Sequence, residues 1–269
     1  MTVMFREIEL NSGGVASRRS RSSIKPLERI FAKHMAEGTV ADVGMVTPTM
    51  KRIRIFCETL DALPYTPGQH VRVEINNPLS LYGILRPGDT LRTYTIWEHS
   101  LEDREFELRA HLYNGDGIGR NWVCNAKVGD PVKFWGPMGD FATEPAPFHV
   151  FIGEETAAAA FGPMIRALGP DASVFGVLES ETPEDEVPVP GRHQLIRVHR
   201  NGASAVASKT LLAGVSNLRL PGKDGMVYIA GEARTCQLIR NHLVHERGWS
   251  RKAIRVKPFW TPGKRGLHH

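Results

Sequence analysis

The sequence predicts a chain with an antiparallel β-barrel in its first half and an α/β domain with a mostly parallel sheet in its second half. In the first half, short segments alternate apolar and polar residues with a period of two, which is typical of half-buried strands. In the second half, short apolar runs alternate with helical segments, which is typical of a parallel sheet covered by helices. We therefore expect a flexible basic N-terminal arm over residues 1–37, the barrel over 38–145, and the α/β domain with a basic C-terminal segment over 146–269.

The positive charge lies at the two ends of the chain. Residues 1–33 contain seven basic and three acidic side chains, and residues 247–269 contain seven basic and no acidic ones. Because the whole chain has a net charge of +5, the part between these ends carries −6. This distribution argues against a uniformly basic nucleic-acid binder. The first segment is rich in Ser, Gly and Arg, which favours a flexible arm.

Three alternating segments predict strands of the barrel, at residues 52–57, 70–75 and 106–112. Turn-forming pairs lie between them, among them Pro67-Gly68 and Gly129-Asp130. Short strands at this spacing are typical of a small barrel.

The second half predicts a repeated strand and helix pattern. We expect strands at 149–152, 173–178, 194–198, 226–230 and 254–259. We expect helices at 156–168, about 205–213 and about 233–247. Ligands of such a domain bind at the carboxyl ends of the parallel strands.

Composition excludes several classes of protein. With 41% hydrophobic and 23% charged residues the chain is typical of a globular protein. No run approaches the roughly 18 apolar residues of a membrane-spanning helix, and the first residues lack the apolar stretch of a secretory signal. We expect a cytoplasmic monomer without membrane insertion. Cys57, Cys124 and Cys236 are far apart, so we expect three buried thiols, no disulfide and no metal site.

The tetrapeptide Arg92-Thr93-Tyr94-Thr95 is the most informative feature of the barrel half. On a strand, Arg92 and Tyr94 point to one face. A guanidinium there suits a phosphate, and the ring beside it suits stacking on another planar group.

A glycine-rich segment, residues 115–122, follows the barrel strand at 106–112. It would place glycines and the N-terminus of a short helix where backbone N–H groups can bind a pyrophosphate. Taken alone, the segment is equally well interpreted as a hairpin turn that leads into a surface helix.

Four motifs in this order resemble the siderophore-interacting proteins, flavin-dependent ferric-siderophore reductases of the ferredoxin-reductase superfamily that include the vibriobactin-utilisation type. The motifs are Arg92-Thr93-Tyr94-Thr95, Gly153-Glu154-Glu155-Thr156-Ala157, Gly231-Glu232-Ala233, and Phe259-Trp260 with Gly263-Lys264. The resemblance covers about residues 38–267. It implies a barrel that binds FAD and a Rossmann-like α/β domain that binds NAD(P)H.

The resemblance also implies the residues of the site. Arg92 would lie near the pyrophosphate of FAD, with Tyr94 and Thr95 at the isoalloxazine ring and Thr156 as a further catalytic residue. The implied cofactor-binding residues are Arg92, Thr93, Tyr94, Thr95, His111, Gly117, Gly119, Arg120, Asn121, Trp122, Gly153, Glu155, Thr156, Ala157, Gly231, Glu232, Ala233 and Trp260.

Three positions depart from the family pattern. Glu154 stands where the family usually has Asp, and Trp97 stands where an Arg often follows the Arg92 motif. Residues 118–120, Ile-Gly-Arg, replace the common Pro-Ala-Ser.

The implied reaction takes electrons from NAD(P)H through FAD to Fe(III) held by a siderophore, so that Fe(II) is released. An anionic ferric siderophore, such as a catecholate complex, would be attracted to a basic cleft. The candidates for its lining are Lys257, Lys264, Arg265 and Arg52, with Lys51 as an alternative to Arg52. A solvated terminal strand explains Lys257 equally well.

The electron donor remains open between NADH, NADPH and a reduced ferredoxin. Glu179, at the end of the second α/β strand, could accept hydrogen bonds from a ribose 2′-hydroxyl and so favour NADH. The acidic run of residues 179–186 is equally well interpreted as a solvated loop. An alternative function is a ferredoxin- or flavodoxin-type NAD(P)H reductase with a protein redox partner, because it would use the same two domains.

Overall fold

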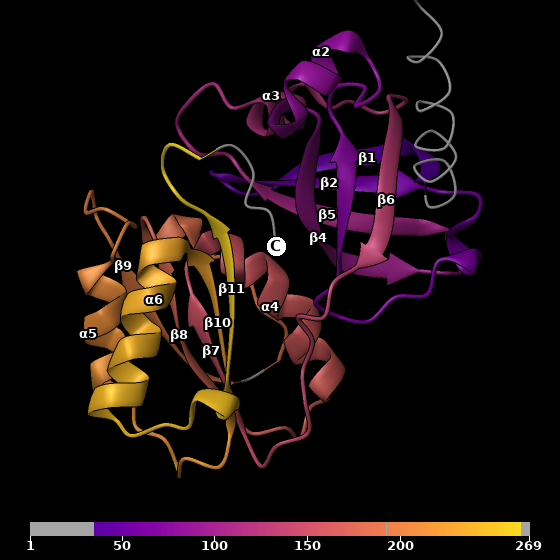
Figure 1. Ribbon diagram of the computed structural model, residues 1–269. Helices are drawn as coiled ribbons and strands as arrows, with labels where there is room; N and C mark the ends of the chain where they lie inside the picture. The colour runs from indigo at the N-terminus through magenta and orange to yellow at the C-terminus, as the bar shows by residue number, and fades with distance from the viewer. Residues whose placement is uncertain (1–34, 192, 265–269) are drawn as a thin grey trace, which may run out of the picture. The chain divides into compact units, whose positions relative to one another are not determined.

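The computed structural model describes residues 35–191 and 193–264 (Figure 1). In this part of the chain one sheet is a closed barrel of six strands and the other has five parallel strands. This architecture confirms the predicted fold class. Residues 1–34, which make up most of the expected arm, and Arg265 lie outside the described residues.

The barrel strands pair antiparallel in the order β1, β2, β5, β4, β3, β6, and β6 closes the barrel against β1. The three alternating segments of the sequence form β2, β3 and β5. Residues 35–37, expected to end the arm, begin β1 and pair with β6. The bounds are β1 (Met35–Thr47), β2 (Met50–Phe56), β3 (His70–Glu74), β4 (Leu91–Ser100), β5 (Glu105–His111) and β6 (Pro131–Met138).

Two short helices, α2 (Leu81–Leu85) and α3 (Ile118–Asn125), lie in the connections of the barrel, and Figure 1 shows both at the same end. Lys51 of β2 secures the second one. Its Nζ donates to the carbonyl oxygens of Val123, Cys124 and Ala126, at 2.8, 3.1 and 3.0 Å. Lys51 therefore satisfies carbonyl groups at the C-terminal end of α3.

The second sheet has the strand order β11, β10, β7, β8, β9 with all neighbours parallel. Each predicted strand is present. The bounds are β7 (His149–Gly153), β8 (Val174–Ser180), β9 (Gln194–His199), β10 (Met226–Glu232) and β11 (Ile254–Trp260). From β7 the chain adds β8 and β9 on one side, and it then returns to add β10 and β11 on the other side of β7. The topological switch point of the sheet therefore lies between the carboxyl ends of β7 and β10.

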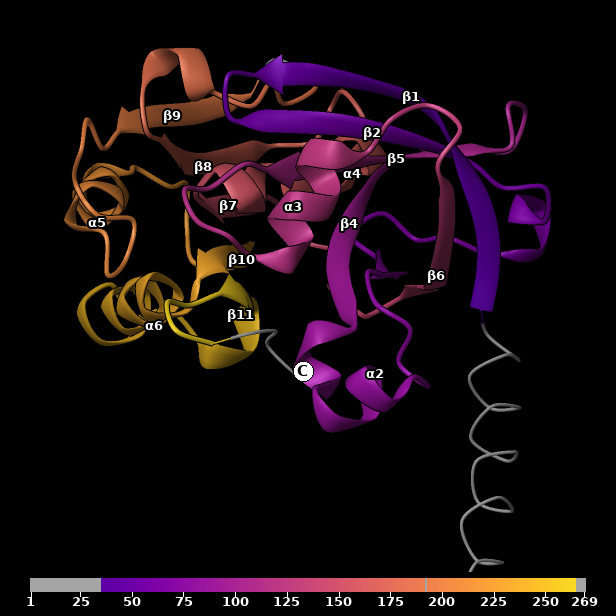
Figure 2. The ribbon, with the colours of Figure 1, turned by 90° about the horizontal axis from the view of Figure 1, so that it is seen from above.

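Helices cover both faces of this sheet. Figures 1 and 2 show α5 (Lys209–Asn217) and α6 (Ala233–Asn241) on one face. On the other face α4 (Glu155–Leu168) packs against strands β7, β8 and β10 and also against β4 of the barrel. The predicted helix at 233–247 is divided, because α6 continues into a π-helical turn, His242–Glu246.

The described residues also test the expectations about membrane-spanning helices and about the burial of the three cysteines. None of the helices there is long and apolar enough to span a membrane. Cys57 and Cys236 are buried as expected, but Cys124 is exposed, because it lies on the solvent side of the short helix α3.

Candidate functional site

Arg92 and Tyr94 of β4 meet the start of α3. The Tyr94 hydroxyl donates to the carbonyl oxygen of Gly119 at 3.1 Å. A Cβ atom at Gly119 would lie 2.9 Å from Arg92 Cγ and 3.0 Å from the Tyr94 hydroxyl, so only glycine fits without displacing them. Burial raises the pKa of Tyr94, which stays a neutral hydrogen-bond donor at physiological pH.

The first turn of α3 has backbone N–H groups that no side chain caps. Its N-cap residue is Gly117, whereas side chains of Ser80, Glu154, Ser208 and Glu232 cap the other α-helices of the described residues. Uncapped N–H groups fit a phosphate, and the aliphatic part of the Arg92 side chain lies against this turn at Gly119. The part of the cofactor that the sequence assigns to this region, the FAD pyrophosphate, therefore fits the residues present.

The guanidinium of Arg92 is held in place by its neighbours. Its Nη1 donates to the carbonyl oxygens of Gly88 and Leu91, at 2.8 and 2.7 Å, and Nη2 lies 3.9 Å from Asp89 Oδ1. These contacts fix the direction of the side chain beside α3, so a ligand need not order it on binding.

The other predicted cofactor-binding residues of the barrel half range from half-buried to exposed. Trp122 contacts the Tyr94 ring with centroids 5.4 Å apart, and Arg120 Nε donates to the Tyr113 carbonyl at 2.8 Å. Thr93 and Asn121 are exposed. The main chain of Thr95 pairs with β3. Burial lowers the pKa of His111, which favours a neutral imidazole.

The switch point between β7 and β10 holds two buried glutamates, Glu154 and Glu232. Glu154 Oε2 accepts from the backbone N–H of Thr156 at 2.8 Å, and Glu232 Oε2 accepts from that of Thr235 at 2.7 Å. Each carboxylate thus caps the helix that follows its strand, α4 or α6. Both helix N-termini are satisfied by the chain itself.

Predicted glycines allow close packing at this point. A Cβ at Gly153 would lie 2.3 Å from the Cβ of Ala157 in α4. Gly231 has a φ of +118° and faces Glu154. Ala233 begins α6 directly after Glu232.

The electrostatic states of the two capping glutamates differ. Burial raises the pKa of Glu154 to about 7, and the neighbouring Glu155 adds to the effect. Burial also acts on Glu232, but its hydrogen bonds from backbone N–H groups outweigh it and lower the pKa of that carboxyl. Glu232 is therefore ionised at neutral pH, whereas Glu154 is divided between two protonation states.

A second buried cluster surrounds Arg200, just after β9. Its two Nη atoms donate to Glu155 at 2.9 and 2.6 Å, and Nη1 also donates to Glu179 at 3.2 Å. The other oxygen of Glu179 accepts from the Ser208 hydroxyl. In this structure both Glu179 oxygens accept from the chain itself and the side chain is buried, so its role toward a ribose 2′-hydroxyl stays a prediction.

Glu155, a predicted cofactor ligand, is engaged in the same cluster. It accepts from Arg200 with both oxygens and from the backbone N–H of Glu181 at 2.7 Å. Burial raises its pKa, but Arg200 outweighs this, and the net pKa lies below the ordinary value. Arg200 was not among the predicted site residues, because it lies 45 residues from Glu155 and no local pattern joins the two.

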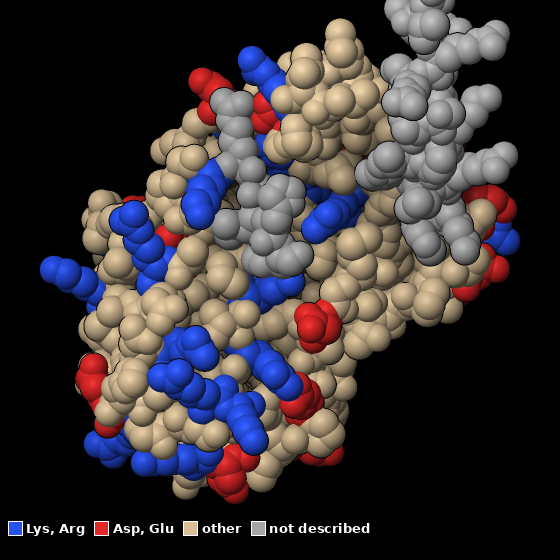
Figure 3. Space-filling model, in the orientation of Figure 1, with Lys and Arg blue, Asp and Glu red and all other residues tan. Residues whose placement is uncertain are grey.

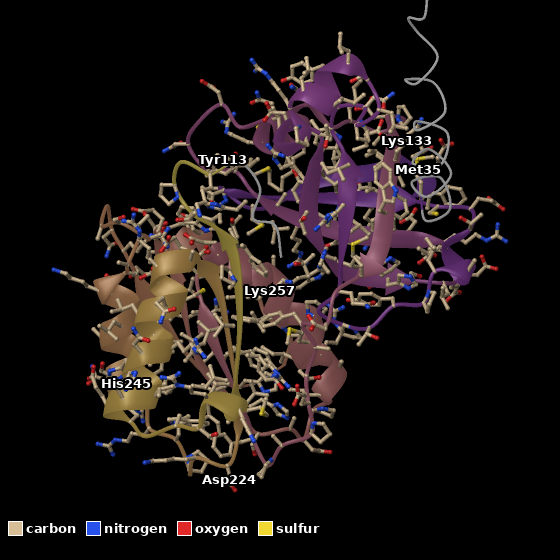
Figure 4. All side chains as sticks on the ribbon, viewed as in Figure 1. Met35, Tyr113, Lys133, Asp224, His245 and Lys257 are labelled. Atoms are coloured by element: carbon tan, nitrogen blue, oxygen red, sulfur yellow. The ribbon has the colours of Figure 1, made fainter. Side chains whose placement is uncertain are left out.

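Lys257 lies on the barrel-facing side of the edge strand β11. Its register partner is Ala230, which belongs to the cluster that packs with α4, as does Phe259 two residues further on. Figure 4 labels Lys257 on β11, between that strand and the barrel. Among the described residues no hydrogen bond or ion pair of Lys257 is found. Lys264 is exposed.

The other predicted substrate ligand of the barrel, Arg52, is already paired. Its Nη2 donates to the Asp42 carboxylate of β1, and both side chains are partly exposed. Arg52 is therefore paired with a barrel carboxylate and Lys51 with α3, whereas Lys257 has no such partner in the part of the chain that the structure describes.

Basic side chains gather on one face of the second domain. Figure 3 shows Lys and Arg side chains over the region of α6 and β11, with few acidic ones among them. Exposed or half-buried members of this region are Arg234, Arg240, Arg251, Lys252, Arg255 and Lys257.

Comparisons with known proteins agree with this geometry. The model of the siderophore-interacting FAD-binding domain matches residues 84–141, and that of the siderophore-interacting protein matches residues 146–263. Ferric vibriobactin reductase ViuB of Vibrio cholerae is 25% identical over 236 residues, which cover 81% of this chain and 86% of that protein. An uncharacterised protein of Mycobacterium tuberculosis is 28% identical over 65% of this chain and 66% of its own length, slightly under two thirds.

Solved structures show the same architecture. A siderophore utilization protein from T. fusca is 26% identical with a TM-score of 0.75, covering 87% of this chain and 95% of that one. The siderophore-interacting protein SipS from Aeromonas hydrophila is 22% identical with a TM-score of 0.72, covering 86% and 93%.

The barrel site and the family models together define a two-domain FAD-binding protein. The chain belongs to the siderophore-interacting protein family, and its barrel carries the FAD-binding domain of that family.

Proposed function

We propose that the protein is an FAD-dependent ferric-siderophore reductase that acts in the cytoplasm with NAD(P)H as electron donor. The observation that supports this most directly is the contact of Arg92 and Tyr94 with the uncapped start of α3, together with Lys257 on the barrel-facing side of β11, which has no hydrogen bond or ion pair among the described residues. The similarity to a ferric vibriobactin reductase points to the same reaction.

The residues of the chain have separate tasks in this proposal. Arg92 and the N–H groups of α3 hold the FAD pyrophosphate, and Tyr94 supports the loop at Gly119 through its hydroxyl. Lys257 attracts an anionic iron complex to the edge of the second sheet. When bound, FAD accepts a hydride from the nicotinamide and supplies single electrons to the ferric substrate.

The test is a reconstitution of the purified full chain with FAD. We expect NADH or NADPH to bleach the flavin absorbance in the absence of oxygen, and a ferric siderophore to restore it while Fe(II) is captured by a chelator. A protein that binds FAD but is not reoxidised by any ferric siderophore would contradict the proposal. Running both nucleotides and a reduced ferredoxin in parallel identifies the donor, which the Arg200 cluster leaves undetermined.

Replacing Arg92 with Ala is expected to raise the dissociation constant of FAD about 10- to 150-fold, because a hydrogen bond to a charged group contributes about 1.5–3 kcal/mol. Fluorescence titration of the apoprotein measures it. Arg86→Ala is the matched control, since Arg86 lies in the same connection and is exposed, with its guanidinium 5.6 Å from the Tyr82 ring. Equal weakening by both variants would contradict a phosphate contact of Arg92.

Replacing Lys257 with Ala is expected to raise KM about 5- to 10-fold for an anionic ferric siderophore and less than twofold for a neutral one, because about 1 kcal/mol of charge attraction is lost. Steady-state kinetics with one chelate of each charge measure this. Lys252→Ala serves as the control, since Lys252 is exposed outside β11. A similar change for both chelates would argue against recognition of charge.

The alternative, a reductase with an acidic protein partner, is favoured by the basic surface over α6 in Figure 3. Arg240→Gln with Arg251→Gln would then slow electron exchange with an acidic redox protein and leave the reduction of a small ferric chelate unchanged. The opposite selectivity supports the siderophore as the substrate.

A further inference from the structure

The end of β11 is held by two side-chain hydrogen bonds to the helix-capping glutamates. Trp260 Nε1 donates to Glu154 Oε1 at 3.0 Å. Thr261 Oγ1 donates to Glu232 Oε1 at 3.2 Å. Two consecutive residues of the C-terminal segment are therefore bound to the N-terminal ends of two different helices, α4 and α6.

Each glutamate divides its two oxygens in the same way. Oε2 of Glu154 caps α4 through the N–H of Thr156, and Oε2 of Glu232 caps α6 through that of Thr235. Oε1 in both cases faces the C-terminal segment. Each glutamate therefore bonds both the first turn of a helix and one residue of the segment 260–261.

The carboxylates have little freedom to turn away. Glu154 is 2% exposed and Glu232 is fully buried. The Thr156 hydroxyl donates to Glu154 Oε1 at 2.5 Å, and a Cβ at Gly231 would lie 2.5 Å from the same oxygen. Glycine at position 231 is thus required by the close approach of Glu154 as well as by its φ of +118°.

The same packing explains why a glutamate follows a glycine both at Gly153-Glu154 and at Gly231-Glu232. Glu154 follows β7 and Glu232 ends β10, so both stand at the switch point where the sheet opens to a ligand. Their oxygens bond the chain itself. They fix the strand end that carries Lys257 on one side and Lys264 on the other.

We propose that Glu154 and Glu232 are positioning residues that hold Trp260 and Thr261 and so direct the C-terminal segment toward the candidate substrate site. The effect on substrate rests on the function proposed above, whereas the effect on the segment does not. The positioning acts through Trp260 and Thr261, and neither glutamate contacts the substrate.

The experiment compares hydrogen exchange of the segment with kinetics in the FAD-loaded full chain. Thr261→Val removes the bond to Glu232 and keeps Trp260, and Trp260→Phe removes the bond to Glu154 and keeps an aromatic ring. Trp249→Phe is the matched control, because Trp249 is buried in the same domain but packs against Phe148. The reporter is the backbone amide of Lys264, which donates to the Thr261 carbonyl.

We expect amide exchange in residues 260–264 to accelerate about 10-fold in each of the two variants, and more in the double variant, with the control unchanged. We also expect Thr261→Val to raise the KM for an anionic ferric siderophore and to change the KM for a neutral one little. Glu154→Gln should accelerate exchange in the same segment and also at the start of α4.

Two results would overturn the proposal. One is unchanged exchange of residues 260–264 in both variants. The other is faster exchange with an unchanged KM for the anionic chelate in a protein that reduces it. If the unmodified protein reduces no ferric siderophore, the proposed function fails, and exchange still decides whether the glutamates hold the segment.

Discussion

Replacing Arg200 with Ala is expected to destabilise the protein by about 3–5 kcal/mol, because the change leaves buried carboxylates without their counter-charge. Arg200 is 9% exposed, and Glu155 and Glu179 are each 2% exposed. Burial lowers the pKa of Arg200, but these carboxylates outweigh the effect and raise it, so the guanidinium stays charged. The free energy of unfolding in urea measures the loss.

The loss should depend on pH. In the native protein the pKa of Glu155 is depressed, so its ionised form contributes stability above the unfolded pKa, and this stability is lost as pH falls through the folded pKa. In the variant, burial without Arg200 raises the pKa of Glu155. The native state of the variant then binds more protons than the unfolded state, and its stability falls as pH rises. We therefore expect a larger difference in unfolding free energy at pH 8 than at pH 5.

Arg197→Ala is the control for this experiment. Arg197 pairs with Glu186 at 3.8 Å, and both side chains are about a quarter to a third exposed, at 24% and 32%. Such a pair contributes about 1 kcal/mol or less. Equal destabilisation by the two variants, or a difference that does not change between pH 5 and pH 8, would contradict the assigned role of the Arg200 cluster.

The fold could be predicted because its signals are local. Alternation at 52–57, 70–75 and 106–112 reports one buried face, and it reappears as β2, β3 and β5. The prediction of one helix over 233–247 is less accurate, because α6 ends at Asn241 and a π-helical turn, His242–Glu246, follows it.

The site could be predicted only in part, because its contacts join residues far apart in the chain. The structure brings Arg92 and Tyr94 to the glycine-rich segment, as the motifs suggested, although their role in binding FAD stays a prediction. Arg200 is 45 residues from Glu155, and Trp260 is 106 residues from Glu154. No local pattern encodes either contact, so the sequence could not show that these glutamates are engaged.

Trp97 is the departure from the family pattern that the structure explains best. It is 4% exposed, and it lies between the barrel and α4. The guanidinium carbon of Arg109 lies 3.4 Å from its ring centroid, and Arg166 of α4 donates to its carbonyl at 3.3 Å. A tryptophan at this position therefore joins the barrel to the α/β domain through its contacts with α4.

Trp97→Ala is expected to cost about 3–5 kcal/mol of stability, because it removes a buried aromatic side chain and its contact with Arg109. Gly162 of α4 lies directly against the ring, since a Cβ there would be 2.0 Å from Trp97 Cζ3. Gly162→Ala alone should therefore cost about 1–3 kcal/mol through overpacking. In the Trp97→Ala background the added methyl group has room and favours the helix by about 1 kcal/mol.

The double variant should consequently be as stable as Trp97→Ala or up to about 1 kcal/mol more stable, which gives a coupling energy of about 1–4 kcal/mol between the two positions. Urea unfolding of the four proteins completes the cycle. Additive losses would show that α4 does not pack on the barrel through this pair of residues. A coupled result would explain why this chain combines a tryptophan after the Arg92 motif with a glycine in the middle of α4. The Trp97 ring occupies the space that a side chain at position 162 would need, so only glycine fits there.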